Sequence, residues 1–212
     1  LYFVQLRRIA RPRSTPDLGR QLVWRWSITY GYRASLVQSK LVLLRFVTDD
    51  RYWPLDALRL SWNGLPRAKH VLRIAPNQRD TRCRHVDRLI LGSLAALHRY
   101  SSHGTPLPQV SWSWKPYERG ESAQLAMQVD RRPRRVLAWR RDSPTRDFRE
   151  ARWSSHGCAR FTSRLRVSSV DRARHYTALY SEATFKDRGE LPFSLSTAVC
   201  IAGGPDAAAP EC

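Results

Sequence analysis

The amino-acid sequence predicts an α/β region built on a mainly parallel sheet, followed by a small antiparallel β-sandwich. Two observations lead to this fold class. Between residues 41 and 100, strand-like and helix-like segments alternate and are joined by short connections. After residue 110, apolar and polar residues alternate instead with a period of two, which is typical of strands with one buried face.

The first strand is expected at residues 41–47, whose sequence LVLLRFV is an almost continuous apolar run. Such a run fits a strand that is covered on both faces of a mainly parallel sheet. Two carboxylates, Asp49 and Asp50, follow it, and a helix is expected at residues 54–62. This segment therefore indicates a strand-to-helix turn that carries acidic side chains.

A second strand is expected at residues 69–75 and a second helix at residues 84–100. Apolar residues recur in that helix at helical spacing and form one stripe, namely Val86, Leu89, Ile90, Leu94 and Leu97. The order strand, helix, strand, helix predicts a right-handed parallel crossover, in which ligands meet the carboxyl ends of the strands. Chemistry is therefore expected in the loops at residues 48–54 and 76–84.

Residues 101–109 contain glycine and two prolines without periodicity and are expected to be a linker. Beyond them, Leu125, Met127 and Val129 share one face of a predicted strand. Further strands are expected at residues 134–141, 145–153, 175–185 and 193–201. The predicted organisation is thus an α/β domain at residues 1–109, a β-sandwich at 110–203 and a disordered tail at 204–212.

The chain carries a formal charge of +19, and its pI is about 11.0. Four of its 37 basic side chains are lysines, so 37 − 4 leaves 33 arginines, which are spread along the whole chain. The densest run, RRPRRVLAWRR at residues 131–141, is interpreted as a solvated strand edge. A nucleic-acid partner is not indicated, since no known binding signature occurs, while an anionic ligand stays open as an alternative.

The cysteines are far apart and form no CxxC pair, so neither a zinc site nor another cofactor is predicted; they are Cys83, Cys158, Cys200 and Cys212. They allow one or two disulfides in an oxidising compartment, and their spacing leaves the pairing open. No apolar run reaches the ~18 residues of a membrane span. Because the sequence begins at Leu1, we expect that an N-terminal part with any secretion signal is missing.

Several longer stretches carry a resemblance to a known family. They are ITYGYRASL, DDRYWPLDALRLSWNGLP and VLRIAPN in the first region, and AWRRDSPTRDFREARW, YTALYSEATF and FSLSTAV in the second. In order and spacing they resemble the C-terminal portion of the PhoPQ-activated pathogenicity-related protein family. The resemblance covers residues 28–203, and its most specific parts are DDRYWPLDAL and TRDFR. It implies an α/β-hydrolase-like sheet at residues 1–109, and a secreted or periplasmic location.

The resemblance also implies a hydrolase triad for acyl or peptide hydrolysis. The acid of that triad would be Asp50, which would orient the histidine and stabilise its imidazolium. The family histidine falls in a PNAxH motif, where this chain reads PNQRD and places Asp80. A carboxylate is a weak proton acceptor, so Asp80 cannot replace the imidazole, and a rescue by His85 is the less favoured alternative.

No GxSxG nucleophile elbow occurs in the sequence, so the chain is expected to be inactive alone. The histidines show no ligand-like spacing, and no metal site is predicted. In TRDFR, we expect Asp147 to form an ion pair that orients arginines beside Trp139 and Trp153, and Phe148 to fill the core. The alternative is that this segment forms a recognition surface. The alternatives are a noncatalytic secreted protein that binds an anionic partner and a degenerate fragment without selected function.

Overall fold

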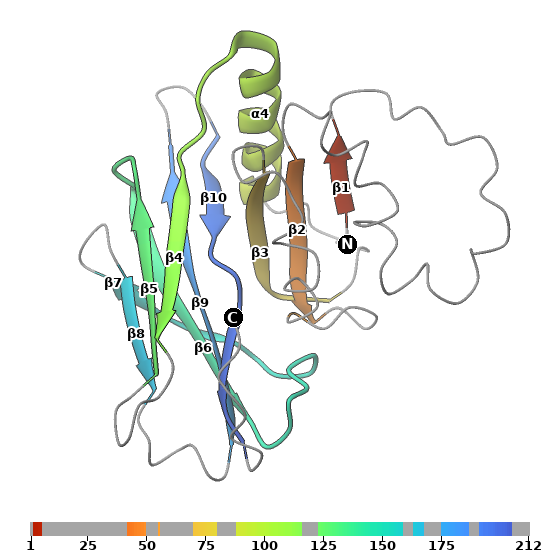
Figure 1. Ribbon diagram of the computed structural model, residues 1–212. Coiled ribbons are helices and arrows are strands. Elements are labelled where there is room, and N and C mark those ends of the chain that lie inside the picture. The colour runs from red at the N-terminus through yellow and green to blue at the C-terminus, as the bar shows by residue number, and fades with distance from the viewer. Residues whose placement is uncertain are drawn as a thin grey trace, which may run out of the picture.

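Three sheets and one helix make up the part of the chain that the structure, a computed structural model, describes: residues 2–5, 42–49, 55, 70–79, 88–115, 123–158, 163–167, 175–186 and 191–204 (Figure 1). The first sheet has the order β1 (Tyr2–Gln5), β2 (Val42–Asp49), β3 (His70–Arg79). The second has the order β10 (Phe193–Ser196), β9 (Tyr176–Phe185), β6 (Arg135–Ser143), β7 (Ser154–Cys158), and β11 (Cys200–Gly203) also pairs with β9. The third has the order β4 (Val110–Lys115), β5 (Ala123–Val129), β8 (Ser163–Val167), and the helix is α4 (Arg88–His103).

The two strands predicted in the first region are confirmed. β2 and β3 pair in parallel, with Val42 opposite His70 and Val47 opposite Ala75. β1 joins the other edge of β2 in the antiparallel direction. The helix predicted at residues 54–62 lies outside the described residues except for Leu55, which is buried.

The predicted fold class is wrong. Apart from β2 and β3, the strand pairs in the described part of the chain are antiparallel, and a parallel α/β-hydrolase-like sheet is not seen there. The described residues are mostly strand, with α4 as their helix. Alternating strand and helix signals at residues 41–100 therefore belong to a small mixed sheet beside a larger antiparallel structure.

The physical reason lies in what covers β3. Its buried residues Leu72 and Ile74 share an apolar cluster with Phe148, Trp153 and Tyr180, which come from the antiparallel region. The backbone N–H of Ile74 also donates to the Ser196 hydroxyl on β10, at 3.1 Å. An apolar run shows that both faces of a strand are covered, but it does not reveal whether helices or strands cover them.

Helix α4 confirms the second predicted helix, with its described bounds at Arg88–His103. Gly104 follows it with φ 69°, and the Gly104 N–H donates to the Tyr100 carbonyl at 3.0 Å, as expected for a C-terminal cap. Near the start of the helix, Gly92 lies against Pro192, just before β10: a Cβ added at Gly92 would come within 1.8 Å of the Pro192 carbonyl oxygen. The helix therefore packs closely on the segment leading into β10 (Figure 1).

The second and third sheets form the predicted sandwich core. In β5 burial alternates along the strand, so that Ala123, Leu125 and Met127 are fully buried. Leu125 packs with Leu179 of the second sheet, and Met127 lies in a cluster with several residues of that sheet. The predicted period of two in this segment is confirmed.

The single strand predicted at residues 193–201 is wrong, because it is divided into two strands. β10 pairs with the second half of β9, and β11 pairs with its first half. Between them, the Thr197 N–H donates to the Ser181 carbonyl at 2.9 Å, and the Thr197 hydroxyl accepts from the Ser181 N–H at 3.0 Å. Residues 193–200 are all buried, including the hydroxyl side chains of Ser194, Ser196 and Thr197.

No helix in the described residues is long and apolar enough to cross a membrane. The boundary expected between residues 109 and 110 stays a prediction.

Candidate functional site

The residues assigned to the ancestral triad, Asp50 and Asp80, lie outside the described residues, as does His85. Their neighbours at the carboxyl ends of β2 and β3 are described, and these ends form the candidate site. Among the described residues, no group of histidine, cysteine and acidic side chains could hold a metal ion.

The two strand ends are held together by a chain of hydrogen bonds. The Asn77 N–H donates to the Thr48 hydroxyl at 2.7 Å, and that hydroxyl donates to a carboxylate oxygen of Asp49 at 2.8 Å. The strand register shifts here, since Val47 pairs with Ala75 whereas Asp49 pairs with Arg79. Asn77 lies within this shift and has φ 54°, a left-handed conformation that asparagine tolerates better than most residues.

The side chain of Asn77 connects the same strand end to a distant segment. Its Nδ2 donates to the Trp153 carbonyl at 3.0 Å, and its Oδ1 accepts from the Trp153 N–H at 2.7 Å. One amide thus satisfies both backbone groups of Trp153, the residue just before β7.

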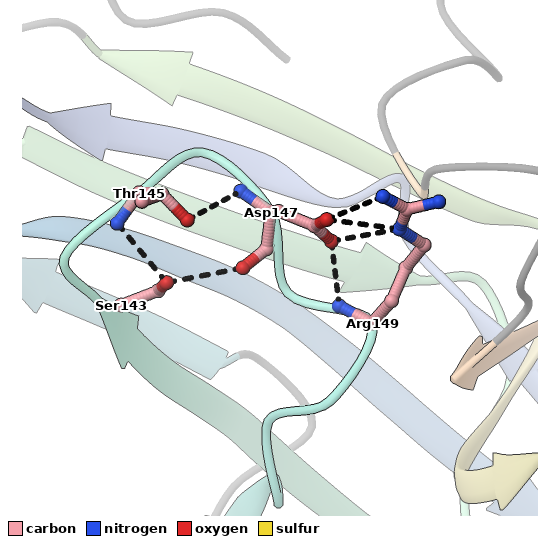
Figure 2. A network of polar contacts seen from close by, with 4 residues as sticks. All are labelled: Ser143, Thr145, Asp147 and Arg149. Carbon is pink, nitrogen blue, oxygen red and sulfur yellow. Dashed lines mark hydrogen bonds and ion pairs between the residues drawn. The ribbon is translucent and has the colours of Figure 1, made fainter.

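Trp153 ends a connecting loop at residues 144–153, for which the sequence predicted a strand. That prediction is wrong, because polar side chains bond to nearby backbone and fold the segment into turns (Figure 2). The Ser143 hydroxyl donates to the Asp147 carbonyl at 3.0 Å, and the Thr145 hydroxyl accepts from the Asp147 N–H at 3.3 Å. The Asp147 carboxylate in turn accepts from the Arg149 N–H at 3.0 Å.

The predicted ion pair of Asp147 is confirmed, and Arg149 is its partner. Arg149 Nε lies 2.9 and 3.0 Å from the two carboxylate oxygens of Asp147, and its Nη2 donates to one of them (Figure 2). The hydrogen bonds from Arg149 hold the pKa of the Asp147 carboxyl below its usual value. Both side chains are exposed, so this pair shapes the loop and adds little stability.

Phe148 and Trp153 anchor the connecting loop to the core. Their exposed fractions are 5% and 3%, which confirms the core position predicted for Phe148. The Trp153 ring meets that of Tyr180 at a centroid distance of 5.3 Å in a T-shaped arrangement. Tyr180 also stacks on Trp139, with centroids 6.0 Å apart, so the aromatic cluster joins β6, β9 and the loop.

A buried ion pair that the sequence analysis missed lies beside this cluster. Arg73 Nη1 on β3 is 3.2 Å from Glu182 Oε2 on β9, and the two side chains are 1% and 2% exposed. Trp139 Nε1 donates to the same carboxylate oxygen at 3.1 Å, and Arg73 Nη1 also donates to the Ile74 carbonyl. The sequence held one signal of this ion pair, the arginine within the apolar run VLRIA. A charge buried in such a strand requires a partner of opposite charge.

Tyr180 has a buried hydroxyl without a hydrogen-bond partner in the described structure. Burial, and next the negative charge of Glu182, raise the pKa of Tyr180 well above its usual value, although Arg73 partly offsets this. The phenol therefore stays neutral and cannot serve as a proton acceptor.

The other predicted features divide into those the structure describes and those it does not. His98, His103, His156 and His175 are exposed, as expected for solvated side chains. The His98 ring nitrogen Nε2 lies 3.3 Å from the Ser102 hydroxyl on the same helix. Cys200 is buried and disulfide-bonded, so at least one of the disulfides that the cysteines allow is present.

Comparison with known proteins identifies one family. The model of the family described as PhoPQ-activated pathogenicity-related protein matches residues 14–149, which is more than half of the chain. No curated protein and no solved structure matches it.

Proposed function

Since the chain belongs to the PhoPQ-activated pathogenicity-related protein family, we propose that it is a member that has lost catalysis and is inactive alone as a hydrolase. The observation that carries the proposal is Asp80, which stands where the resemblance assigns a histidine. A carboxyl group with a usual pKa near ~3.9 accepts protons far more weakly at neutral pH than an imidazole with a pKa near ~6.5. Asp80 would therefore be a far less effective general base toward a serine hydroxyl than the family histidine.

The hydrogen bonds at the carboxyl ends of β2 and β3 support a structural role for Thr48 and Asn77. Thr48 accepts one hydrogen bond and donates another, and the amide of Asn77 is engaged at both of its polar atoms. These groups serve the joint between β2, β3 and the connecting loop. This arrangement supports a structural rather than a catalytic use of Thr48 and Asn77.

The test is a turnover assay of the parent chain on a panel of esters and aminopeptide substrates. We expect no turnover above that of buffer for the parent and for an Asp80→Asn variant. Asp80→His is the matched variant that supplies an imidazole at the same position. Turnover by the parent chain that disappears in an Asp50→Asn variant would overturn the proposal, because it would show a working acid without the family histidine.

A second candidate function is recognition of an anionic partner, and one observation favours it. The turn between β5 and β6 and the start of β6 expose Arg131, Arg132, Arg134 and Arg135. Binding through such side chains weakens steeply as salt is added, whereas binding through apolar contacts does not. Retention on a cation exchanger would not suffice as a test, because the whole chain is basic; site-directed variants are needed.

We also propose that the protein acts outside the reducing cytoplasm, in the periplasm or after secretion. The disulfide at Cys200 supports this location, because structural disulfides persist in oxidising compartments. Cell fractionation with thiol labelling provides the test. Recovery of the protein in the cytoplasm with Cys200 reactive toward a maleimide after denaturation would contradict the proposal.

A further inference from the structure

Five cations gather at one end of the sandwich. Arg131, Arg132, Arg134 and Arg135 belong to the turn between β5 and β6 and the start of β6, and all are exposed. Lys186 directly follows β9 and is also exposed. We call these five residues the basic tip.

Strand pairing places Lys186 beside the arginines. Arg135 lies opposite Thr184 in the β6–β9 ladder, and the Arg134 N–H donates to the Thr184 carbonyl at 2.7 Å. Continuing this antiparallel register brings Lys186 opposite Pro133. In Figure 1 the β5–β6 connection and the end of β9 accordingly lie at the same end of the molecule.

The turn is held in place by its backbone and its first two residues. The Asp130 carboxylate accepts from the Gln109 N–H at 2.8 Å, and Arg131 Nη2 donates to the Pro106 carbonyl at 3.1 Å. Within the described structure, the side chains of Arg134 and Arg135 make no hydrogen bond or ion pair. Their guanidinium groups are therefore presented to solvent on an anchored support.

Two large apolar side chains are exposed beside this end. Leu191 precedes β10 and is 41% exposed, and Leu91 on α4 is 44% exposed. Their chain neighbours, Gly92 and Pro192, are in close contact, so the two leucines flank one helix–strand crossing. β10 starts with Phe193 opposite Phe185, which sets Leu191 at the same end as Lys186.

We propose that the basic tip docks on an anionic membrane surface through the phosphates of lipid headgroups, with Leu191 entering the interface. This inference deepens the anionic-partner candidate described above and rests on it. Basic and apolar side chains at one end of the sandwich fit an anionic bilayer, because both kinds of side chain gain free energy at its interface. A nucleic acid is a poorer fit, because one face of the half-buried Trp139 already stacks on Tyr180 and its Nε1 is bonded to Glu182.

The decisive experiment is vesicle flotation with the whole chain. Vesicles contain either phosphatidylcholine alone or equal parts phosphatidylcholine and phosphatidylglycerol. We expect binding to the anionic vesicles only, and a loss of about 30-fold in affinity for Arg134→Gln/Arg135→Gln, as two cations near an anionic surface contribute roughly that factor.

The matched control is Arg146→Gln/Arg152→Gln, which removes the same net charge from exposed positions in the connecting loop. That loop follows β6, and the nine residues of β6 span about 27 Å. This is more than three Debye lengths of about 8 Å at physiological salt, so we expect an affinity within twofold of the parent. Leu191→Ser is expected to weaken vesicle binding without changing salt dependence, and urea unfolding verifies that every variant folds.

Equal losses in the two double variants would overturn the proposal, because the effect would then follow net charge alone. So would equal binding to neutral vesicles. Binding to soluble DNA or to a sulfated polysaccharide through the same arginines, without vesicle binding, would also overturn it and leave the anionic-partner candidate standing. If the parent chain binds neither vesicles nor soluble polyanions, the membrane proposal and the anionic-partner candidate both fail. These binding results are independent of the turnover assay.

Discussion

Glu182 offers the sharpest test of how the first sheet is joined to the sandwich. Its carboxylate lies 3.2 Å from Arg73 Nη1 and accepts from Trp139 Nε1, and both charged side chains are almost fully buried. Glu182→Leu would leave the guanidinium in the core without its carboxylate. Breaking a buried pair in this way costs about 3–5 kcal/mol, a large part of the roughly 5–15 kcal/mol that stabilises a typical domain.

The double variant Arg73→Met/Glu182→Leu separates the ion pair from the packing. With both charges removed, the desolvation cost disappears, and apolar side chains of similar length fill the space. We expect the double variant to recover most of the loss and to lie within about 1 kcal/mol of the parent. Trp139→Phe is the control, since it removes one hydrogen-bond donor and should cost roughly 1 kcal/mol.

Urea denaturation followed by tryptophan fluorescence measures the free energies of unfolding of the parent, the single variants Arg73→Met and Glu182→Leu, the double variant and Trp139→Phe. The coupling energy between the two positions is the difference between the double variant and the sum of the single variants. A Glu182→Leu variant that unfolds within 1 kcal/mol of the parent would refute the reasoning, because Arg73 would then have a substitute partner or access to water. So would a double variant as unstable as the single one.

Four further outcomes are expected. Asn77→Ala should lower the free energy of unfolding by roughly 1–3 kcal/mol in urea denaturation, because both backbone groups of Trp153 lose their partners, whereas Asn77→Asp should keep the acceptor and lose less. Gly92→Ala should lower the melting temperature by several degrees, since its Cβ would meet backbone at 1.8 Å. Gly157→Ala is the control, because nothing lies within 4 Å of the added Cβ there and the backbone φ is not positive. Tyr180→Phe should stabilise by about 1 kcal/mol at neutral pH, because it removes a buried hydroxyl without a partner. It should also reduce the loss of stability above pH ~10, where the unfolded phenol ionises and the raised pKa keeps the folded one neutral; an unchanged alkaline melting profile would contradict this. Because the pKa of Asp147 is lowered in the folded state, its contribution to stability is present above pH ~3.9 and is lost as the pH falls below that value. Asp147→Asn should therefore reduce the acid-side loss of the free energy of unfolding, by less than about 1 kcal/mol, as measured by urea denaturation at several pH values.

The sequence predicted the secondary structure of the core more reliably than the way its parts pack. β2, β3 and α4 lie where apolar runs and the helical stripe indicated them, and the buried face of β5 follows its period of two. These signals are local, because each strand or helix must bury its own apolar residues. What covers each face depends on long-range pairing, and a run such as residues 41–47 is the same under helices as under a second sheet.

The connecting loop shows a second limit of the sequence pattern. Residues 145–153 alternate in polarity well enough to suggest a strand, yet Ser143, Thr145 and Asp147 bond to nearby backbone and fold the segment into turns. Local side-chain hydrogen bonds of this kind compete with a ladder, and they outweigh weak alternation. The ion pair and the buried Phe148 were predictable, because they need only neighbouring residues and one large apolar side chain.

The candidate site was the least predictable part, since its key contacts join residues that are far apart in the sequence, by 76 positions in one case and 109 in the other. Asn77 meets Trp153, and Arg73 meets Glu182. No single-sequence pattern links such positions, although a buried arginine in an apolar strand shows that an acid must lie nearby. The triad assignment for Asp50 and Asp80 stays a prediction.

These contacts give the two family-like stretches VLRIAPN and TRDFREARW a common structural role. The first supplies Arg73 and Asn77, and the second supplies Phe148 and Trp153, which pack or bond against the same end of β3. Residues on either side of position 109 therefore contribute to one apolar cluster, with a buried ion pair beside it. A loss of catalysis would leave these residues under the same constraint, because each of them still has to satisfy a buried polar group or fill the core. The joint that these motifs build thus gives a reason for their presence that does not depend on turnover.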